Sequence, residues 1–418
     1  MSKKLLLSVV AVFFFMSMAL YSPREASAIP AFARQTGMAC NSCHFQHFPS
    51  LNAFGRAFKA GGYTQIGGQS LVEGEHLSIP VTLNASLVTK IRYQKRNGST
   101  TTGDAGELNK GQLQFPDEAA FLIGGRAGEH VGFLLEASLK DGDPLFTSFK
   151  MPITFDVHGV NLSAIPFLTD SAGASYGFET FNTGALRMAR PFEHRTQTSA
   201  QQYIGTDGKA TGLALVASHS MGFVNYTPFV REHPSSGTNG NTVAAGPYLN
   251  YFRGAVTPTV AGWDLGAGFQ VWNGTSKSIV DASGVVREHA DAWALDAQAQ
   301  GEVAGLPLGL YATYAVAKKS EAGKVANVYN TNTFDDKTAW TLTGELGVIP
   351  HRLTVGAAYR GGHTGASSND SDNATTLAFV YEAAQNVEFQ LNHSWLTGDV
   401  PSTTSGKNLT TLMLFAAF

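Results

Sequence analysis

The chain has 418 residues, of which 15% are charged, and its formal net charge is −3. That balance provides no basic block to neutralise phosphates, so it excludes nucleic acid as a partner. The apolar content (43%) and the 45 glycines suit an all-β chain as well as an ordinary globular protein.

The N-terminus has the pattern of an export signal. Two lysines precede an apolar run at residues 5–20, and the tripeptide ASA at 26–28 supplies a small-x-small cleavage site. The run is shorter than the roughly 20 residues of a transmembrane helix. We therefore expect residues 1–28 to be a Sec-type signal peptide, with an uncleaved anchor as the alternative. The mature chain then begins near Ile29, outside the cytoplasm.

The only two cysteines of the chain stand together, as Cys40-Asn-Ser-Cys43 followed by His44. Two thiols at this spacing reach both vinyl groups of one haem, and the adjacent histidine then faces the iron. A disulfide is one alternative in an exported protein, and a zinc site that adds His47 is another. We expect one covalent haem c, with His44 as an axial ligand of the haem iron.

Residues 29–68 form the predicted monohaem c-type cytochrome segment. So short a chain does not bury enough surface to fold alone, and a haem bound to it would stay exposed. We expect the segment to plug the mouth or the lumen of the region that follows. The alternative is a haem that hangs free, with its apolar surface in water.

One short helix is predicted within this segment, over residues 49–63, with a proline in its first turn and two glycines at its end. Leu51, Phe54 and Phe58 form an apolar stripe suited to covering a haem face. Arg56 and Lys59 lie off that stripe and are candidates to pair with haem propionates. Two solvated charges on an amphipathic helix are the alternative.

The sixth ligand of the haem iron stays open at this point, and a water-bound or open position is one of the alternatives. His47 lies on the same side of the haem as His44, so it does not easily reach the opposite face. Met38 is close to the motif in sequence, but the short intervening chain constrains it. Five residues of the following region are further candidates: Met151, Met188, Met221, His158 and His219.

From about residue 80 onward, apolar and polar residues alternate with a period of two. Clear examples are 81–93, 130–140, 263–272, 340–348, 353–360 and 387–395. Strands with one apolar and one polar face fit either a soluble sandwich or a barrel with lipid outside and water inside.

Three observations favour the membrane barrel. Aromatic residues at predicted strand ends fit an interfacial girdle: Tyr93, Trp263, Trp340, Tyr359, Tyr381 and Trp395. The polar faces carry small and charged residues suited to a wet lumen. The chain stops on a strand that ends in Phe418, which resembles the assembly signal of bacterial outer-membrane barrels.

Long polar connections and tight turns alternate along this region. Long connections are expected near 94–111, 141–149, 190–210, 231–246, 273–290, 318–337, 361–374 and 397–408, and tight turns at 125–130, 303–309, 347–352 and 382–386. This predicts an all-β fold over residues 69–418: a transmembrane antiparallel up-and-down barrel of about sixteen strands. Residues 150–182 fit strands poorly, so fourteen or eighteen strands remain alternatives.

The stretch from Ile29 to Tyr63 closely resembles one family, the fused monohaem cytochrome–porins, outer-membrane iron oxidases of iron-oxidising bacteria. The resemblance rests on three motifs in this sequence: FARQTG at 32–37, CxxCHFQ at 40–46 and FGRxFKxxGY at 54–63. It covers some 35 residues closely and the remaining chain only in layout. It implies haem attachment at Cys40 and Cys43 and axial ligation by His44.

The resemblance also implies an activity. The protein would be an Fe(II)-oxidising electron-transfer protein of the outer membrane, which takes electrons from extracellular Fe(II) and passes them to a periplasmic c-type cytochrome. A porin with a structural haem plug and a conduit that exports electrons are the alternatives. Eight acidic loop residues are candidates to attract Fe(II), and a role in keeping the loops soluble is the alternative: Asp104, Glu107, Asp141, Asp143, Asp335, Asp336, Asp370 and Asp372.

Overall fold

The computed structural model describes residues 31–98, 109–184, 192, 199–234, 242–281, 284–401 and 406–418. The predicted signal peptide lies outside these residues. No helix among them is long and apolar enough to cross a membrane.

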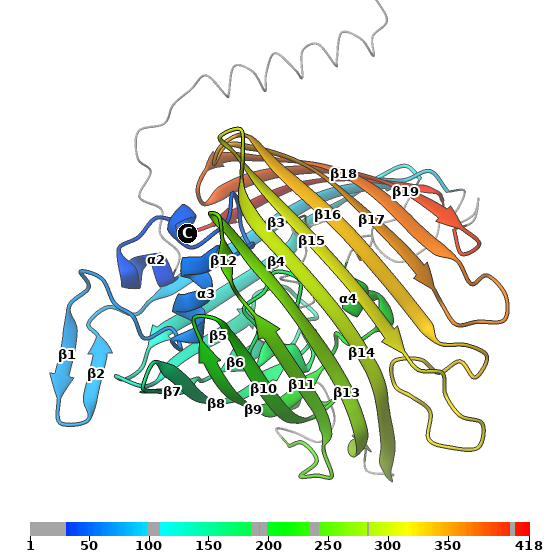
Figure 1. Cartoon of the computed structure of the whole chain (residues 1–418), viewed down its shortest axis with the longest axis horizontal. Coiled ribbons are helices and arrows are strands. Elements are labelled where there is room, and N and C mark those ends of the chain that lie inside the picture. The colour runs from blue at the N-terminus through cyan, green and yellow to red at the C-terminus, as the bar shows by residue number, and fades with distance from the viewer. Residues whose placement is uncertain are drawn as a thin grey trace, which may run out of the picture.

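The fold is a closed antiparallel β-barrel (Figure 1). Its wall consists of β3 (Ala85–Arg96), β4 (Gln112–Arg126), β5 (Gly132–Ser138), β6 (Phe146–Lys150), β7 (Ile153–Val157), β8 (Val160–Thr169), β9 (Ala210–His219), β10 (Gly222–Val230), β11 (Leu249–Val256), β12 (Thr259–Val260), β13 (Trp263–Asp281), β14 (Gly284–Val303), β15 (Leu306–Ala317), β16 (Lys337–Ile349), β17 (Leu353–His363), β18 (Asp372–Ala384), β19 (Val387–Gly398) and β20 (Asn408–Ala417). β6 and β7 both pair with β8, and β11 and β12 both pair with β13. We therefore count β6 with β7, and β11 with β12, as one interrupted strand each. The described wall then has sixteen strands, which confirms the predicted barrel of about sixteen.

The barrel closes between its last and first strands. β20 pairs with β3 from Leu409↔Arg96 to Ala417↔Val88. Just past this ladder, Phe418 and Leu87 exchange two backbone hydrogen bonds of 2.9 Å each. The terminal phenylalanine therefore lies at the seam, where it helps to leave no free sheet edge.

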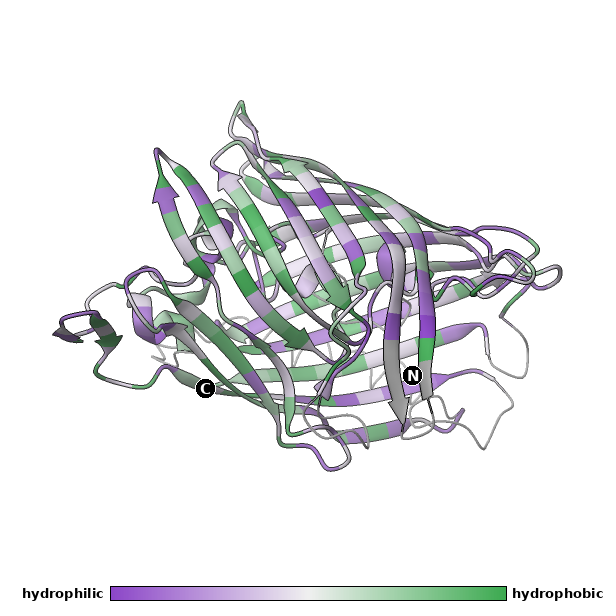
Figure 2. Cartoon of the chain, turned by 90° about the horizontal axis from the view of Figure 1, so that it is seen from below, coloured by the Kyte–Doolittle hydropathy of each residue, from purple (hydrophilic) through white to green (hydrophobic). Residues whose placement is uncertain are grey.

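The predicted alternation of faces is confirmed along the wall. On β3, Leu87 and Tyr93 are exposed on the outside, whereas Lys90 and Arg92 are buried inside. Polar and apolar residues alternate along the strands in Figure 2. An apolar exterior over a polar interior is the arrangement of a barrel that spans a membrane.

Aromatic residues mark two levels of the barrel, as predicted. Tyr93, Trp340, Tyr359 and Trp395 lie near the ends of strands that lead into long connections, and the rings of Trp340 and Tyr359 lie 4.9 Å apart. Trp263 opens β13 at the opposite end. Such belts suit the two interfaces of a bilayer.

The predicted tight turns lie at one end of the barrel, which we call the short-turn end. The predicted turns join β4 to β5, β14 to β15, β16 to β17 and β18 to β19. One predicted long loop is wrong: residues 273–290 mostly continue β13 and β14, which pair as far as Asp281↔Gly284. The residues of this hairpin are polar, and their composition therefore suggested a loop. Backbone pairing between β13 and β14 nevertheless continues through them.

The connection between β8 and β9 folds into the barrel. Its described part, residues 170–184, 192 and 199–209, is called the lumenal connection here. It carries η2 (Ala174–Tyr176) and α4 (Ala200–Ile204), and the backbone N–H of Ala200 donates to Thr313 Oγ1 of β15 at 3.0 Å. The long outer loop predicted at 190–210 is therefore wrong in its described part, because buried residues such as Ile204 pack inside.

The N-terminal segment, residues 31–68, lies at the short-turn end beside the C-terminus (Figure 1). It contains α2 (Ala31–Thr36), η1 (Cys40–Ser42) and α3 (Ala53–Ala60). The predicted helix is shorter than expected, because the Asn52 side chain caps it by accepting from the Gly55 N–H at 2.9 Å. A hairpin follows, β1 (Leu71–Gly74) with β2 (Leu77–Pro80). It is a separate sheet, so the barrel wall starts at Ala85 instead of residue 69.

Candidate functional site

The Cys-x-x-Cys-His motif is held in a compact backbone frame. Cys40 begins the 3-10 turn η1, and its carbonyl accepts from the N–H groups of Cys43 at 3.1 Å and His44 at 2.9 Å. The chain then returns, so that Asn52 N–H donates to the Cys43 carbonyl at 3.0 Å. Local backbone hydrogen bonds therefore hold the backbone of the motif in one conformation.

Both thiols are free and partly exposed. Burial raises the pKa of Cys43, and burial together with the nearby Glu382 carboxylate raises that of Cys40. The two side chains form no disulfide with each other in this structure.

His44 is arranged as a neutral imidazole with one free nitrogen. Its Nδ1 lies 3.2 Å from the Ser50 carbonyl oxygen. A carbonyl only accepts, so Nδ1 carries the proton and the lone pair of Nε2 stays available. Burial, partly offset by the Ser50 and Pro49 carbonyls, lowers the pKa of His44 to about 4 although the residue keeps some exposure. This tautomer fits an axial ligand oriented by a backbone carbonyl.

Helix α3 packs directly on the motif, and a glycine makes this approach possible. A Cβ atom at Gly55 would lie 2.2 Å from the Cys43 carbonyl oxygen and 3.1 Å from the Leu51 side chain. The Phe58 ring of the same helix packs at 5.3 Å from Phe32 and 5.8 Å from Tyr63. Phe58 of the predicted apolar stripe therefore packs against other residues of the N-terminal segment.

His47 faces the barrel wall instead of the cysteines. Its Nε2 pairs with Glu345 Oε2 at 2.8 Å, and its Nδ1 pairs with the Phe48 carbonyl at 2.9 Å. Burial alone would lower its pKa, but Glu345 outweighs burial and raises the pKa to about 9. Both ring nitrogens are engaged, so His47 is not placed to complete a zinc site or to act as a sixth ligand. No group of three or more His, Cys, Asp or Glu within the described residues is placed to hold a metal ion.

Arg56 also binds the wall. Its guanidinium pairs with Asp264 and donates to Gln300 Oε1 at 3.1 Å. Burial lowers the pKa of Lys59 to about 8, and the nearby carboxylate of Glu179 partly offsets this effect. Pairing of these two cations with haem propionates stays a prediction, and for Arg56 the structure provides another partner.

A continuous chain of hydrogen bonds connects His47 and Arg56 across four adjacent strands. Gln300 Nε2 donates to the Tyr311 hydroxyl at 3.1 Å, which donates to Glu345 Oε1 at 2.5 Å. We call this set the docking network, and its members are His47, Arg56, Asp264, Gln300, Tyr311 and Glu345. It fixes the motif-bearing segment inside the mouth of the barrel.

Two further side chains anchor the segment. Gln35 donates to the carbonyls of Tyr63 at 2.6 Å and Gln65 at 2.7 Å, and its Oε1 accepts from the Arg126 N–H at 2.9 Å. Asn182 of the lumenal connection accepts from the Leu51 N–H at 2.8 Å and donates to the Leu51 carbonyl at 2.9 Å. Neither was identified from the sequence, because a single amide side chain carries no periodic signal.

The candidates for a sixth ligand do not converge on the motif. His158 and Met221 are exposed in the short turns after β7 and β9, and His219 is exposed at the end of β9. Met151 lies in the break between β6 and β7, and Met188 lies outside the described residues. Met38 is partly exposed within the segment itself.

Several acidic residues of the outer loops have cationic partners. Asp336 pairs with Lys318 at 2.9 Å, and Asp370 pairs with His363 at 2.7 Å. Asp372 pairs with Arg360 at 2.7 Å. These contacts favour a structural role, whereas Asp104 and Glu107 lie outside the described residues.

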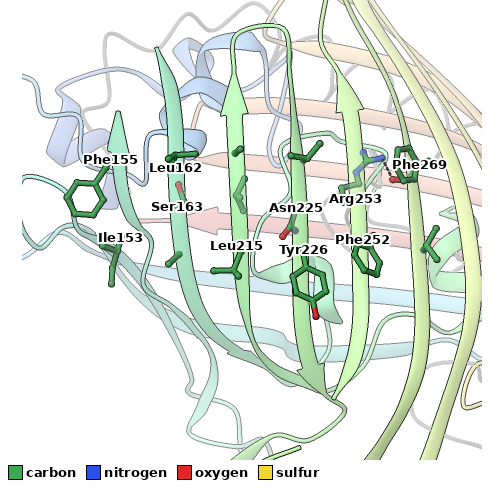
Figure 3. Close-up of a pocket in the computed structure, with 15 residues that line it drawn as sticks. Ile153, Phe155, Leu162, Ser163, Leu215, Asn225, Tyr226, Phe252, Arg253 and Phe269 are labelled. Carbon is green, nitrogen blue, oxygen red and sulfur yellow. Dashed lines mark hydrogen bonds between the residues drawn. The ribbon is translucent and has the colours of Figure 1, made fainter. Parts of the chain in front are cut away.

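A wide apolar hollow of about 810 Å³ lies away from the motif, on the wall between β7 and β13 (Figure 3). Phe155, Leu162, Phe252 and Phe269 line it and are 40–49% exposed. These side chains belong to the outward-facing, apolar side of their strands, so this hollow fits the lipid-facing surface and not a catalytic pocket.

Comparison with known proteins yields the fold. No family model and no curated protein matches the chain. Among solved structures, OprB of Pseudomonas putida is similar with a TM-score of 0.53 and 12% identity, over 81% of this chain and 94% of that one. The outer membrane channel DcaP of Acinetobacter baumannii gives a TM-score of 0.48 and 10% identity, over 81% and 97% of the two chains. At such identities the likeness to OprB shows a porin-like barrel and nothing finer.

Proposed function

We propose that this chain is an outer-membrane c-type cytochrome–porin, which accepts electrons from extracellular Fe(II) through one covalent haem and passes them to a periplasmic electron carrier. The observation that carries the proposal is the motif itself: two free thiols and a neutral His44, fixed in one frame inside the mouth of a membrane barrel. The apolar exterior of the barrel supports placement in the outer membrane.

The residues present fit a haem of the c type. Cys40 and Cys43 would form the two thioether bonds, and His44 Nε2 would ligate the iron. When bound, the haem would supply a one-electron carrier whose potential depends on its axial ligands, its burial and nearby charge. The Ser50 carbonyl orients the His44 ring, and the Gly55 contact holds α3 against the motif.

The barrel provides what a soluble cytochrome lacks, a passage through about 25 Å of lipid. The docking network holds the motif within this passage, and the lumenal connection contacts the segment from the other side through Asn182. Oxidation of Fe(II) outside the cell would keep insoluble ferric oxide out of the periplasm. The chain itself needs no acid–base residue for such a reaction.

A passive channel is the alternative that the barrel fold favours. Two layers of chain cross the described lumen, the N-terminal segment and the lumenal connection, and both bind lumenal side chains such as Glu345 and Thr313. A barrel filled in this way should conduct ions poorly in planar bilayers. High conductance of the intact protein would favour the channel.

The decisive experiment is a pyridine haemochrome spectrum of outer membranes that contain the wild type or Cys43→Ala. The wild type should show one covalent haem, and the variant should lose at least one thioether and shift its spectrum. Stopped-flow mixing of the purified protein with Fe(II) should then reduce the haem. A wild type without a chromophore would end the proposal, whereas a haem that Fe(II) does not reduce would exclude iron as the donor. A very negative haem potential would instead favour electron export.

A further inference from the structure

A buried carboxyl group lies beside the Cys-x-x-Cys-His motif and outside the docking network. Glu382 is near the short-turn end of β18, and it is only 7% exposed. The turn that follows approaches the motif, because Gln385 Oε1 accepts from the Asn41 N–H at 3.5 Å. The Glu382 carboxylate also helps to raise the pKa of Cys40. Glu382 is therefore close to the first cysteine of the motif.

Three inward-facing side chains of adjacent strands connect this position with His44. Glu382 is opposite Glu388 of β19, and Glu388 is opposite Phe415 of β20. The Phe415 ring stacks on Phe48 at 4.9 Å, and the Phe48 ring lies 5.3 Å from the His44 ring. This row of the wall therefore lies next to the proposed axial ligand as well as to the cysteine.

The carboxyl group of Glu382 has no direct partner that neutralises it. Its Oε2 atom is buried, and among the described residues it has no hydrogen-bond partner. Two cationic side chains face Glu382, Arg352 and His47. Arg352 donates to the backbone carbonyls of Glu382 and Ala383 at 3.3 Å and 3.2 Å, and His47 pairs with Glu345. Both cations are therefore engaged with other atoms.

The other titratable groups that face Glu382 are Glu388 and Cys40. The Glu388 carboxylate opposes a negative charge at Glu382, and Cys40 would be an uncharged thioether once a haem is attached. A carboxylate that is poorly solvated and lies near a like charge takes up a proton readily. The protonation of Glu382 should therefore respond to any change of charge close to the motif.

We propose that Glu382 is a redox-linked proton site for the haem, an inference that rests on the proposed function. While the haem iron is ferric, Glu382 is a carboxylate. When the donor supplies one electron to the iron, Glu382 takes up one proton from water. It returns this proton to water when the electron leaves for the periplasmic carrier. The net charge around the motif stays constant, and the haem potential depends on pH.

The test measures the haem potential of the full-length protein in detergent by spectroelectrochemistry. The pH is varied between about 5 and 8, below the pKa of about 9 of His47, so that the segment stays docked. Glu382→Gln imitates the protonated form, and Glu382→Asp retains the carboxyl group. Asp156→Asn is the matched control, because this exposed carboxylate is in β7, which does not neighbour β18 in the wall. Redox-difference infrared spectra follow the carboxyl group directly.

We expect the wild-type potential to fall as pH rises, by at most one proton per electron, because the reduced state binds the proton more tightly. Glu382→Gln should lose at least half of this slope and keep a higher potential at the alkaline end. Glu382→Asp and Asp156→Asn should keep a pH-dependent potential. Reduction of the wild type should add a protonated-carboxyl band that is missing in Glu382→Gln.

Two results would overturn this inference and leave the cytochrome function standing. One is a wild-type potential that does not change with pH, and the other is a wild-type slope in Glu382→Gln. A wild type without haem would end the proposed function and this inference with it. Heat-modifiable gel mobility verifies that each variant is folded, and the wild-type spectra decide the question even if a variant fails to assemble.

Discussion

The barrel wall and the N-terminal segment are stabilised in different ways. Each wall strand is held by continuous backbone ladders to two neighbours, so no single side chain decides whether it forms. The segment has only short helices and is fixed by individual contacts, chiefly Gln35, His47, Arg56 and Leu51. The scaffold should therefore tolerate substitutions that release the segment, and loss of function should be separable from loss of fold.

The largest effect is expected from deletion of residues 31–65. The barrel should still assemble, because β3 and β20 close it without the segment. Conductance in planar bilayers should rise several-fold, since one of the two lumenal layers is gone. Deletion of residues 71–80, the β1–β2 hairpin that is not part of the barrel wall, is the control and should leave conductance unchanged. Equal conductance of the intact and shortened chains would show that the segment is not the barrier.

Gly55→Val should release the segment without unfolding the barrel. The new Cβ would meet the Cys43 carbonyl at 2.2 Å, and two backbone elements cannot separate without losing the frame of the motif. We expect a cost of about 3 kcal/mol to the docked state. Gly61→Ala is the matched control, because its Cβ would make an ordinary 3.4 Å contact. Urea midpoints for protease cleavage of the segment measure both, and equal midpoints would contradict the packing argument.

The barrel wall and the N-terminal segment also differ in how much of each can be predicted from the sequence. Alternation with a period of two identifies the wall, its faces and its short turns, because every strand repeats the signal. The Cys-x-x-Cys-His motif is equally visible, since its spacing is local. The partners of His47 and Arg56 were not predicted, because Glu345 and Asp264 lie some 300 and 200 residues away and look like ordinary lumenal residues. Chain folded into a lumen likewise resembles an outer loop in composition, as at α4.

Docking of the segment should weaken at alkaline pH. The contact with Glu345 raises the pKa of His47 from the ordinary histidine value of about 6.5 to about 9, so protonation favours docking. The full contribution, about 3 kcal/mol as an upper bound, is present below pH 6.5 and is lost as pH rises through 9. Its facing charges are Glu345, which pairs with it, and the nearby Glu388 and Glu382.

Glu345→Gln is the test of this pH dependence. The urea midpoint for segment release should fall between pH 6.5 and 9.5 in the wild type and change much less in the variant. Glu302→Gln, at an exposed carboxylate near the end of β14, should retain the wild-type slope. An equal slope in Glu345→Gln would assign the pH dependence to other groups.

The smallest effect is expected where the two lumenal layers meet. Asn182→Ala removes both hydrogen bonds to the Leu51 backbone, which should lower the stability of the docked segment by about 1–2 kcal/mol. Asn161→Ala, on the wall strand β8, is the control and should leave the urea midpoint unchanged. If Asn182→Ala behaves like this control while Glu345→Gln does not, the segment is held by the wall alone. A measurable loss would instead mean that the lumenal connection clamps the segment, so that a shift in one layer is felt by the other.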